Sequence, residues 1–60
     1  MSQEEFIKLV LKYHAAGMDA DLTARQIVDD HFIATGRSLH MSQHIVEHLV
    51  KETLKKENLL

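Results

Sequence analysis

The sequence predicts an all-α fold: one small domain, residues 1–60, with three helices at about residues 3–16, 22–35 and 42–57. Two observations support this prediction. The chain has no proline and only two glycines, Gly17 and Gly36, which divide it into three pieces of helical length. Hydrophobic residues make up 45% of the chain, which is too many for a disordered segment.

The size of the chain predicts that it needs support beyond its own core. A 60-residue domain buries only about 60% of its unfolded surface, and folds of this size usually rely on disulfides, a metal or oligomerisation. The chain has no cysteine, which excludes disulfides and thiolate zinc sites. We therefore expect a homodimer.

Charge and hydropathy favour a cytoplasmic, soluble protein. The net charge is −2, so there is no strong overall bias toward nucleic acid. No apolar run approaches the ~20 residues that span a bilayer. The opening residues MSQEEFIK are acidic before they are apolar, the reverse of a signal peptide.

The first helix is expected to begin after Ser2, which forms a capping box with Glu5, and to close at Gly17. Its apolar residues cover more than half of the circumference, although one packed face needs a stripe of only about 100°. These residues are Phe6, Ile7, Leu9, Val10, Leu11 and Tyr13. We therefore expect two neighbours around this helix, either both from the same chain or one from a second subunit.

The second helix is expected to begin near Asp21 or Thr23, because Thr23 and Gln26 form a second capping pair. Its predicted apolar stripe consists of Ala24, Ile27, Val28, His31 and Phe32. Leu22 and Ile33 fall on the polar side, which leaves them for a partner or a packed loop.

The third helix has Ser42 as its preferred N-cap, with Met41 and Val46 as the hydrophobic staple; Ser38 is the alternative start. Its apolar stripe is predicted to centre near Thr53 and to consist of Ile45, Val46, Leu49, Val50, Thr53 and Leu54. Lysines in the last turns complement the helix dipole, and Leu59 and Leu60 either dock back or reach a neighbour.

A histidine at every fourth position, in the segment HMSQHIVEH, raises the question of a metal site. On the wheel of the third helix, an exposed contact face gathers opposite the apolar stripe, formed by His44, His48, Lys51 and Lys55. Two imidazoles are too few for zinc, and the lysine charges oppose a cation, so we expect no metal and no cofactor. Zinc bridging two subunits, an anionic partner and a solvated surface remain as alternatives. His14 and His31 lie within apolar stripes and are expected in the core.

Catalysis is not expected, because the chain has no cysteine, no phosphate-cradling glycine loop and no nucleophile–base spacing. A pocket for chemistry also needs volume that so short a chain rarely encloses.

A helix-turn-helix that binds DNA is one alternative, with TGRSLHMS as the turn and the third helix as the reading helix. The candidate DNA contacts are then Arg37, Ser38, His40, Ser42, Gln43 and His44. Phe32 departs from the motif, which prefers a small residue there, and the turn is long. The seven basic residues are spread over all three helices, which is unfavourable for phosphate neutralisation.

A protein-interaction module is the leading prediction, because the chain has more apolar surface than so small a fold needs. The residues expected in packing or self-association are Phe6, Val10, Ile45, Leu49 and Leu54. The alternative is that packing of the three helices buries all of this apolar surface.

The segment EEFIKLVLKYHAAGMD, residues 4–19, resembles the helix-and-turn opening of the Sin-type anti-repressors. Glu5, Phe6 and Ile7 match the acidic–aromatic–aliphatic pattern, with phenylalanine where that family has tryptophan, and residues 17–19 match its turn. The family's second-helix pattern, Glu-Glu-Ile-Arg, is missing. The resemblance implies a small regulator that binds a transcription factor through a helical hairpin.

Overall fold

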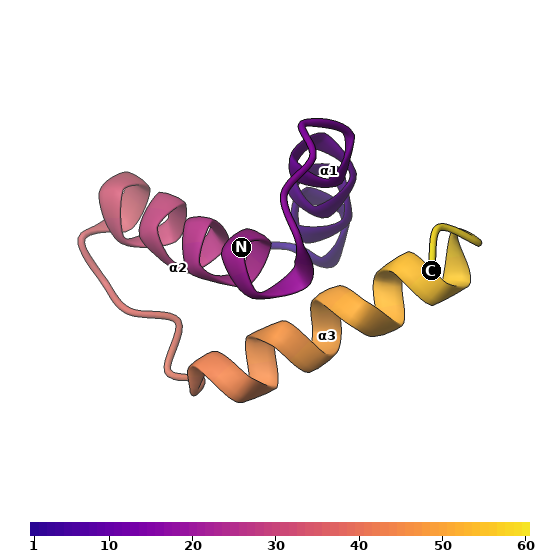
Figure 1. Cartoon of the computed structure of the whole chain (residues 1–60). Coiled ribbons are helices and arrows are strands. Elements are labelled where there is room, and N and C mark those ends of the chain that lie inside the picture. Colours follow the sequence, from indigo (N-terminus) through magenta and orange to yellow (C-terminus); the bar gives the residue numbers. More distant parts are fainter.

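The computed structural model describes all 60 residues and contains three helices and no strand (Figure 1). The helices are α1 (Gln3–Ala15), α2 (Ala20–Thr35) and α3 (Gln43–Lys56). The all-α, three-helix prediction is confirmed. None of the helices combines the length and the apolar character that crossing a membrane requires.

Two of the three predicted helix starts are confirmed by their caps. The Ser2 hydroxyl accepts a hydrogen bond from the Glu5 backbone N–H at 3.1 Å, and the Ser42 hydroxyl accepts one from the Ile45 N–H at 3.3 Å. Each bond satisfies a backbone donor that the helix cannot pair internally.

α2 begins at Ala20, next to the predicted start near Asp21, but the predicted Thr23–Gln26 capping pair is wrong. Asp19 is the N-cap, and its carboxylate accepts from the Leu22 N–H at 2.8 Å. Thr23 lies inside the first turns of the helix and is 1% exposed. Aspartate is as good an N-cap as serine, and the earlier start lets Ala20 pack against the core.

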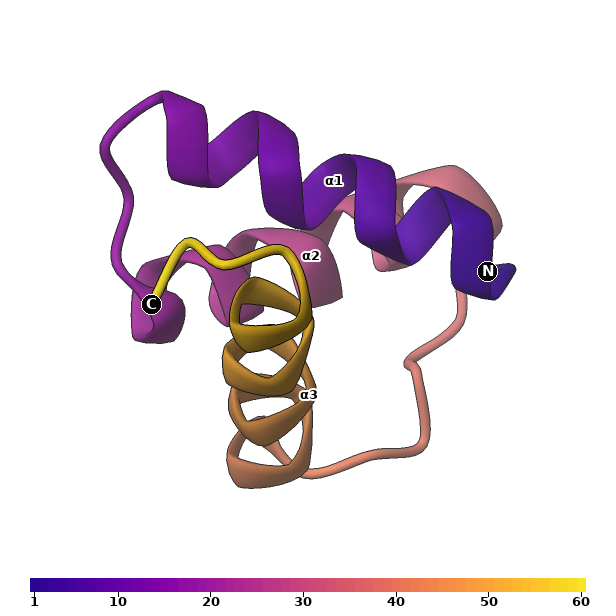
Figure 2. The ribbon, with the colours of Figure 1, turned by 90° about the vertical axis from the view of Figure 1, so that its right-hand side faces the viewer.

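The three helices cross rather than run side by side. In Figure 1 α1 is foreshortened and α3 runs across the view, whereas in Figure 2 α1 runs across and α3 is foreshortened, so these two axes cross steeply. The loop of seven residues, 36–42, carries the chain back along α2. As a result the Gln43 side chain donates a hydrogen bond of 3.3 Å to the backbone carbonyl of Asp21, in the first turn of α2.

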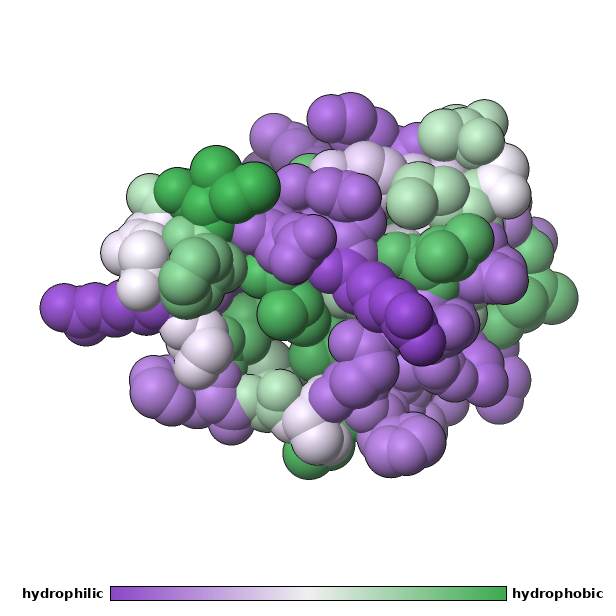
Figure 3. Space-filling model, turned by 60° about the vertical axis from the view of Figure 1, so that its left-hand side comes forward, coloured by the Kyte–Doolittle hydropathy of each residue, from purple (hydrophilic) through white to green (hydrophobic).

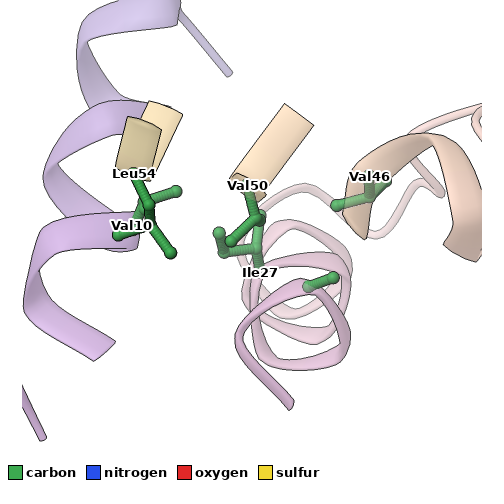
Figure 4. Close-up of a cluster of buried hydrophobic side chains, with 6 residues drawn as sticks. Val10, Ile27, Val46, Val50 and Leu54 are labelled. Carbon is green, nitrogen blue, oxygen red and sulfur yellow. The ribbon is translucent and has the colours of Figure 1, made fainter. Parts of the chain in front are cut away.

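All three helices contribute to the core, which Figure 4 shows in close-up. Val10 of α1 points toward Leu54, and Ile27 of α2 points toward Val50. The buried hydrophobic residues are Val10, Ala24, Ile27, Val46, Val50 and Leu54. The prediction that α1 has more than one neighbour is confirmed within a single chain, because α1 contacts both α2 and α3.

The predicted orientation of α3 is wrong by one row of side chains. Its buried row is Val46, Val50 and Leu54, whereas Ile45 is 50% exposed and Leu49 is 38% exposed. The centre of the buried face therefore lies at Val50 rather than Thr53, a rotation of about 60° at 100° per residue. Burying the Val46 row keeps one apolar line through three turns, whereas the Leu49 row would bring a threonine into the core.

The C-terminal turns of α2 are also more exposed than their pattern predicts. Phe32 was expected to face inward but is 57% exposed, and His31 is only half-buried. Because α3 begins beside the start of α2, no helix covers the end of α2. His14 is likewise half-buried, in the last turn of α1, so neither histidine lies inside the core.

Candidate protein-binding groove

An apolar groove lies where the first turns of α1 meet α3 and the 36–42 loop. It has a volume of about 380 Å³. Its apolar lining consists of Met1, Phe6, Ile7, Leu39, Met41 and Leu49, and its polar edge of Ser2, Gln3, Glu52, Thr53, Lys56 and Glu57. We call this feature the apolar groove.

Each side of the groove has a local cause in the sequence. The Ser2 cap starts α1 early enough to place Phe6 and Ile7 in its first two turns, beside α3. Burial of the Val46 row turns Leu49 away from the core and toward the groove. The loop that returns along α2 brings Leu39 and Met41 to the third side.

The charges at the edge of the groove are of both signs. Glu52, Lys56 and Glu57 all line the groove, and Glu52 pairs with Lys55 at 3.9 Å. These groups are close to solvent, where an ion pair contributes about 0–1 kcal/mol. The groove therefore combines six apolar residues with polar and charged groups, as a typical protein interface does.

The structure divides the residues predicted for packing or self-association into two groups. Phe6 and Leu49 line the groove, and Ile45 is exposed on the same side of α3. Val10 and Leu54 are 0% and 3% exposed, so they pack inside the chain and are not available to a partner.

The predicted contact face of α3 is exposed, but its lysines are not free charges. Lys51 pairs with Glu47 at 3.1 Å and Lys55 pairs with Glu52 at 3.9 Å. His44 and His48 are exposed beside them. No group of three or more histidine or acidic side chains is arranged to hold a metal ion. This face offers an anionic partner less positive charge than its composition indicates.

The candidate DNA contacts are also divided. The Ser42 hydroxyl caps α3, and the Gln43 amide bonds to Asp21, so both side chains have partners within the chain. Arg37 and Ser38 lie in the loop, and His44 is exposed. A helix-turn-helix joins its two helices by a turn of about 3–4 residues. The connection between α2 and α3 in this chain is longer, with seven residues.

Sequence reasoning missed Ile7, Leu39, Met41 and Met1 as members of one site. Ile7 lies on the wide apolar stripe of α1, which already indicated a second neighbour. Leu39 and Met41 lie in a loop, where helical periodicity carries no information about the path of the chain. The one available signal was the presence of two large apolar residues in a segment that is otherwise polar.

Apolar side chains reach the surface outside the groove as well. Figure 3 shows apolar and hydrophilic groups interspersed on one face of the molecule. Ile33 on α2 is 80% exposed and Leu60 is 69% exposed. Single exposed residues of this kind are ordinary, whereas the groove gathers six in one concave place.

No family model, curated protein or solved structure matches this chain. The interpretation of the groove therefore rests on its own geometry.

Proposed function

We propose that this chain is a non-enzymatic regulatory protein that binds a larger protein through the apolar groove. The observation that supports the proposal is the groove itself: six apolar residues from three parts of the chain surround a volume of about 380 Å³. The chain leaves this surface open although its buried core contains only six hydrophobic residues.

The shape of the groove favours an amphipathic helix as the bound segment. Such a helix places apolar side chains at i, i+3, i+4 and i+7 along one face, and grooves between crossing helices accept them as anchors. A volume of about 380 Å³ holds a few large side chains rather than a whole domain. A transcription regulator is the partner that the resemblance of residues 4–19 implies, and such a partner would place the activity in the cytoplasm.

The proposal includes a homodimer as the free form of the protein. Ile45 and Leu49 form an exposed apolar row on α3, next to Met41. Sedimentation equilibrium is the test: association that depends on concentration, weakened by Ile45→Gln, is expected. A chain that stays monomeric throughout the range would contradict this part of the proposal.

Partner binding is tested by affinity capture with matched variants. Leu49→Gln and Met41→Gln replace groove residues, while Ile33→Gln replaces a more exposed residue on α2, outside the groove. A captured protein should be retained by the wild type and by Ile33→Gln and lost from both groove variants. Circular dichroism of each variant is the control for folding, and a helical content equal to that of the wild type is expected. Equal retention by all four proteins would overturn the proposal.

A further inference from the structure

A second hollow adjoins the apolar groove at the end of α2. Its volume is about 610 Å³, and its lining consists of Met1, His31, Thr35, Arg37, Ser38, Leu39 and His40. Met1 and Leu39 line both features, so the two share a wall. We call the second feature the basic hollow.

The lining of the basic hollow contains nitrogen donors and no carboxylate. Arg37, His31 and His40 all contribute, in a chain that has nine acidic residues and a net charge of −2. The three ion pairs of the chain are formed by Arg25, Lys51 and Lys55. The Arg37 guanidinium is therefore left without a carboxylate partner.

Local hydrogen bonds fix the backbone around the hollow. The Thr35 hydroxyl donates a hydrogen bond of 2.9 Å to the His31 carbonyl and accepts one of 3.1 Å from the Arg37 backbone N–H. One side chain thus ties the last turn of α2 to the residue that carries the guanidinium. The loop bearing Arg37 leaves the helix in a defined direction.

The conformation of His40 is a second, independent observation. Its φ is +57°, in the left-handed region that residues other than glycine rarely adopt. Outliers of this kind need the surrounding structure to hold them and concentrate at functional sites. Here the left-handed residue is one that lines the hollow.

The negative end of the α2 helix dipole repels an anion, but the positive charge nearby attracts it more strongly. A helix C-terminus carries the equivalent of about half a negative charge. The Arg37 guanidinium alone carries a full positive charge, and each imidazole has at least one N–H donor in either protonation state. The balance of charge and donors at the hollow favours an anion.

We propose that the basic hollow binds a phosphate group. The planar guanidinium of Arg37 matches the geometry of two phosphate oxygens, a pairing for which arginine is better suited than lysine. His31, His40 and the Ser38 hydroxyl supply donors to the remaining oxygens. The site does not depend on the function of the groove, because its donors, on His31, Arg37, Ser38 and His40, do not line the groove.

The test is a titration of the labelled full-length chain with inorganic phosphate, followed by amide chemical shifts at neutral pH. Saturable shifts confined to residues around the basic hollow are expected. Arg37→Gln should weaken binding about tenfold or more, and Arg37→Lys by less, since it keeps the charge but not the fork. Arg25→Gln, on the exposed side of α2, is the control and should leave binding unchanged.

Two outcomes would overturn the proposal. Shifts that are spread over all lysines and arginines, without saturation, would show only nonspecific screening. Binding that is unaffected by Arg37→Gln would show that the Arg37 guanidinium does not hold the phosphate.

A second arm identifies the source of the phosphate. Fluorescence anisotropy of a random duplex DNA at low salt detects backbone binding, which is strongly sensitive to added salt. DNA binding that is weakened by Arg37→Gln and displaced by phosphate would assign the site to nucleic acid. Phosphate binding without DNA binding would assign it to a small phosphorylated ligand.

Discussion

The hydroxyl of Tyr13 on α1 donates a hydrogen bond to the carboxylate of Asp30 on α2, joining residues 17 positions apart. The other oxygen of this carboxylate accepts from the Gln26 side chain over 3.0 Å. The bond to Asp30, desolvation and repulsion between the two negative charges, in that order, raise the pKa of Tyr13 from 10.0 to about 12. Because the bond needs the Tyr13 proton, alkaline pH weakens this contact between α1 and α2.

Alkaline pH should therefore weaken the wild type more than a Tyr13→Phe variant. The pKa of Tyr13 is higher in the folded chain than in the unfolded chain. Its contribution is fully present below about pH 10 and is lost as pH rises toward about 12. Urea unfolding at both ends of this window measures the difference between the two proteins. An equal fall in both would show that the contact does not contribute.

At neutral pH the same Tyr13→Phe substitution should lower the free energy of unfolding by about 0.5–1.5 kcal/mol, the usual net contribution of one hydrogen bond. Urea denaturation followed by circular dichroism measures this loss. A Gln26→Ala variant keeps the Tyr13 donor and removes only the second bond to Asp30, so it should cost less.

Two leucines on the same helix should respond differently to alanine. Leu54 is 3% exposed and Leu49 is 38% exposed. Leu54→Ala leaves a cavity and should lower the free energy of unfolding by about 2–5 kcal/mol. A loss of this size unfolds much of so small a domain. Leu49→Ala should cost clearly less, since part of its side chain is already in water. Thermal melts of both variants test the orientation of α3, and a larger loss from Leu49→Ala would contradict it.

The start of α2 can be tested at its cap. Asp19→Ala removes the acceptor for the Leu22 N–H and should cost about 0.5–2 kcal/mol, whereas Asp19→Asn keeps an acceptor and should cost little. Chemical denaturation of both variants provides the comparison. If neither variant changed the stability, Asp19 would not be the N-cap, and the helix would begin nearer Asp21.

Gly36 ends α2 with a φ of +71° and has open space where a Cβ would lie. Gly36→Ala should therefore destabilise the fold through backbone strain alone, by about 1–2 kcal/mol. Gly36→Asn should lose less, because asparagine tolerates the left-handed region. Melting temperatures of the two variants test this ranking, and an unchanged Gly36→Ala protein would contradict the αL closure.

Local signals in the sequence predict much of this fold. Glycines at the breaks and serines before apolar runs locate two helix starts, because capping depends on only a few neighbouring residues. The cap of α2 was misplaced because Thr23 and Gln26 resemble a cap as closely as Asp19 does. The choice between them is made by packing, which buries Thr23.

Features that depend on the path of the loop were not predictable. Periodicity gives α3 two adjacent apolar rows, and only the position of its neighbours decides that Val50 is buried and Leu49 is exposed. The same path leaves Phe32 uncovered and brings Leu39 to the groove. Phe6 and Leu49 were recognised as candidate contacts from their apolar stripes alone.

The small core has a consequence for the life of the protein in a cell. A domain of this length has a stability of about 3–9 kcal/mol at typical values per residue. A ligand at 100 times its dissociation constant that binds only the folded chain adds about 2.7 kcal/mol. Unoccupied chains therefore spend more time unfolded, where proteases cut them. A partner that fills the apolar groove as we propose would protect the chain from this turnover, and the copy number of the protein would then follow that of the partner.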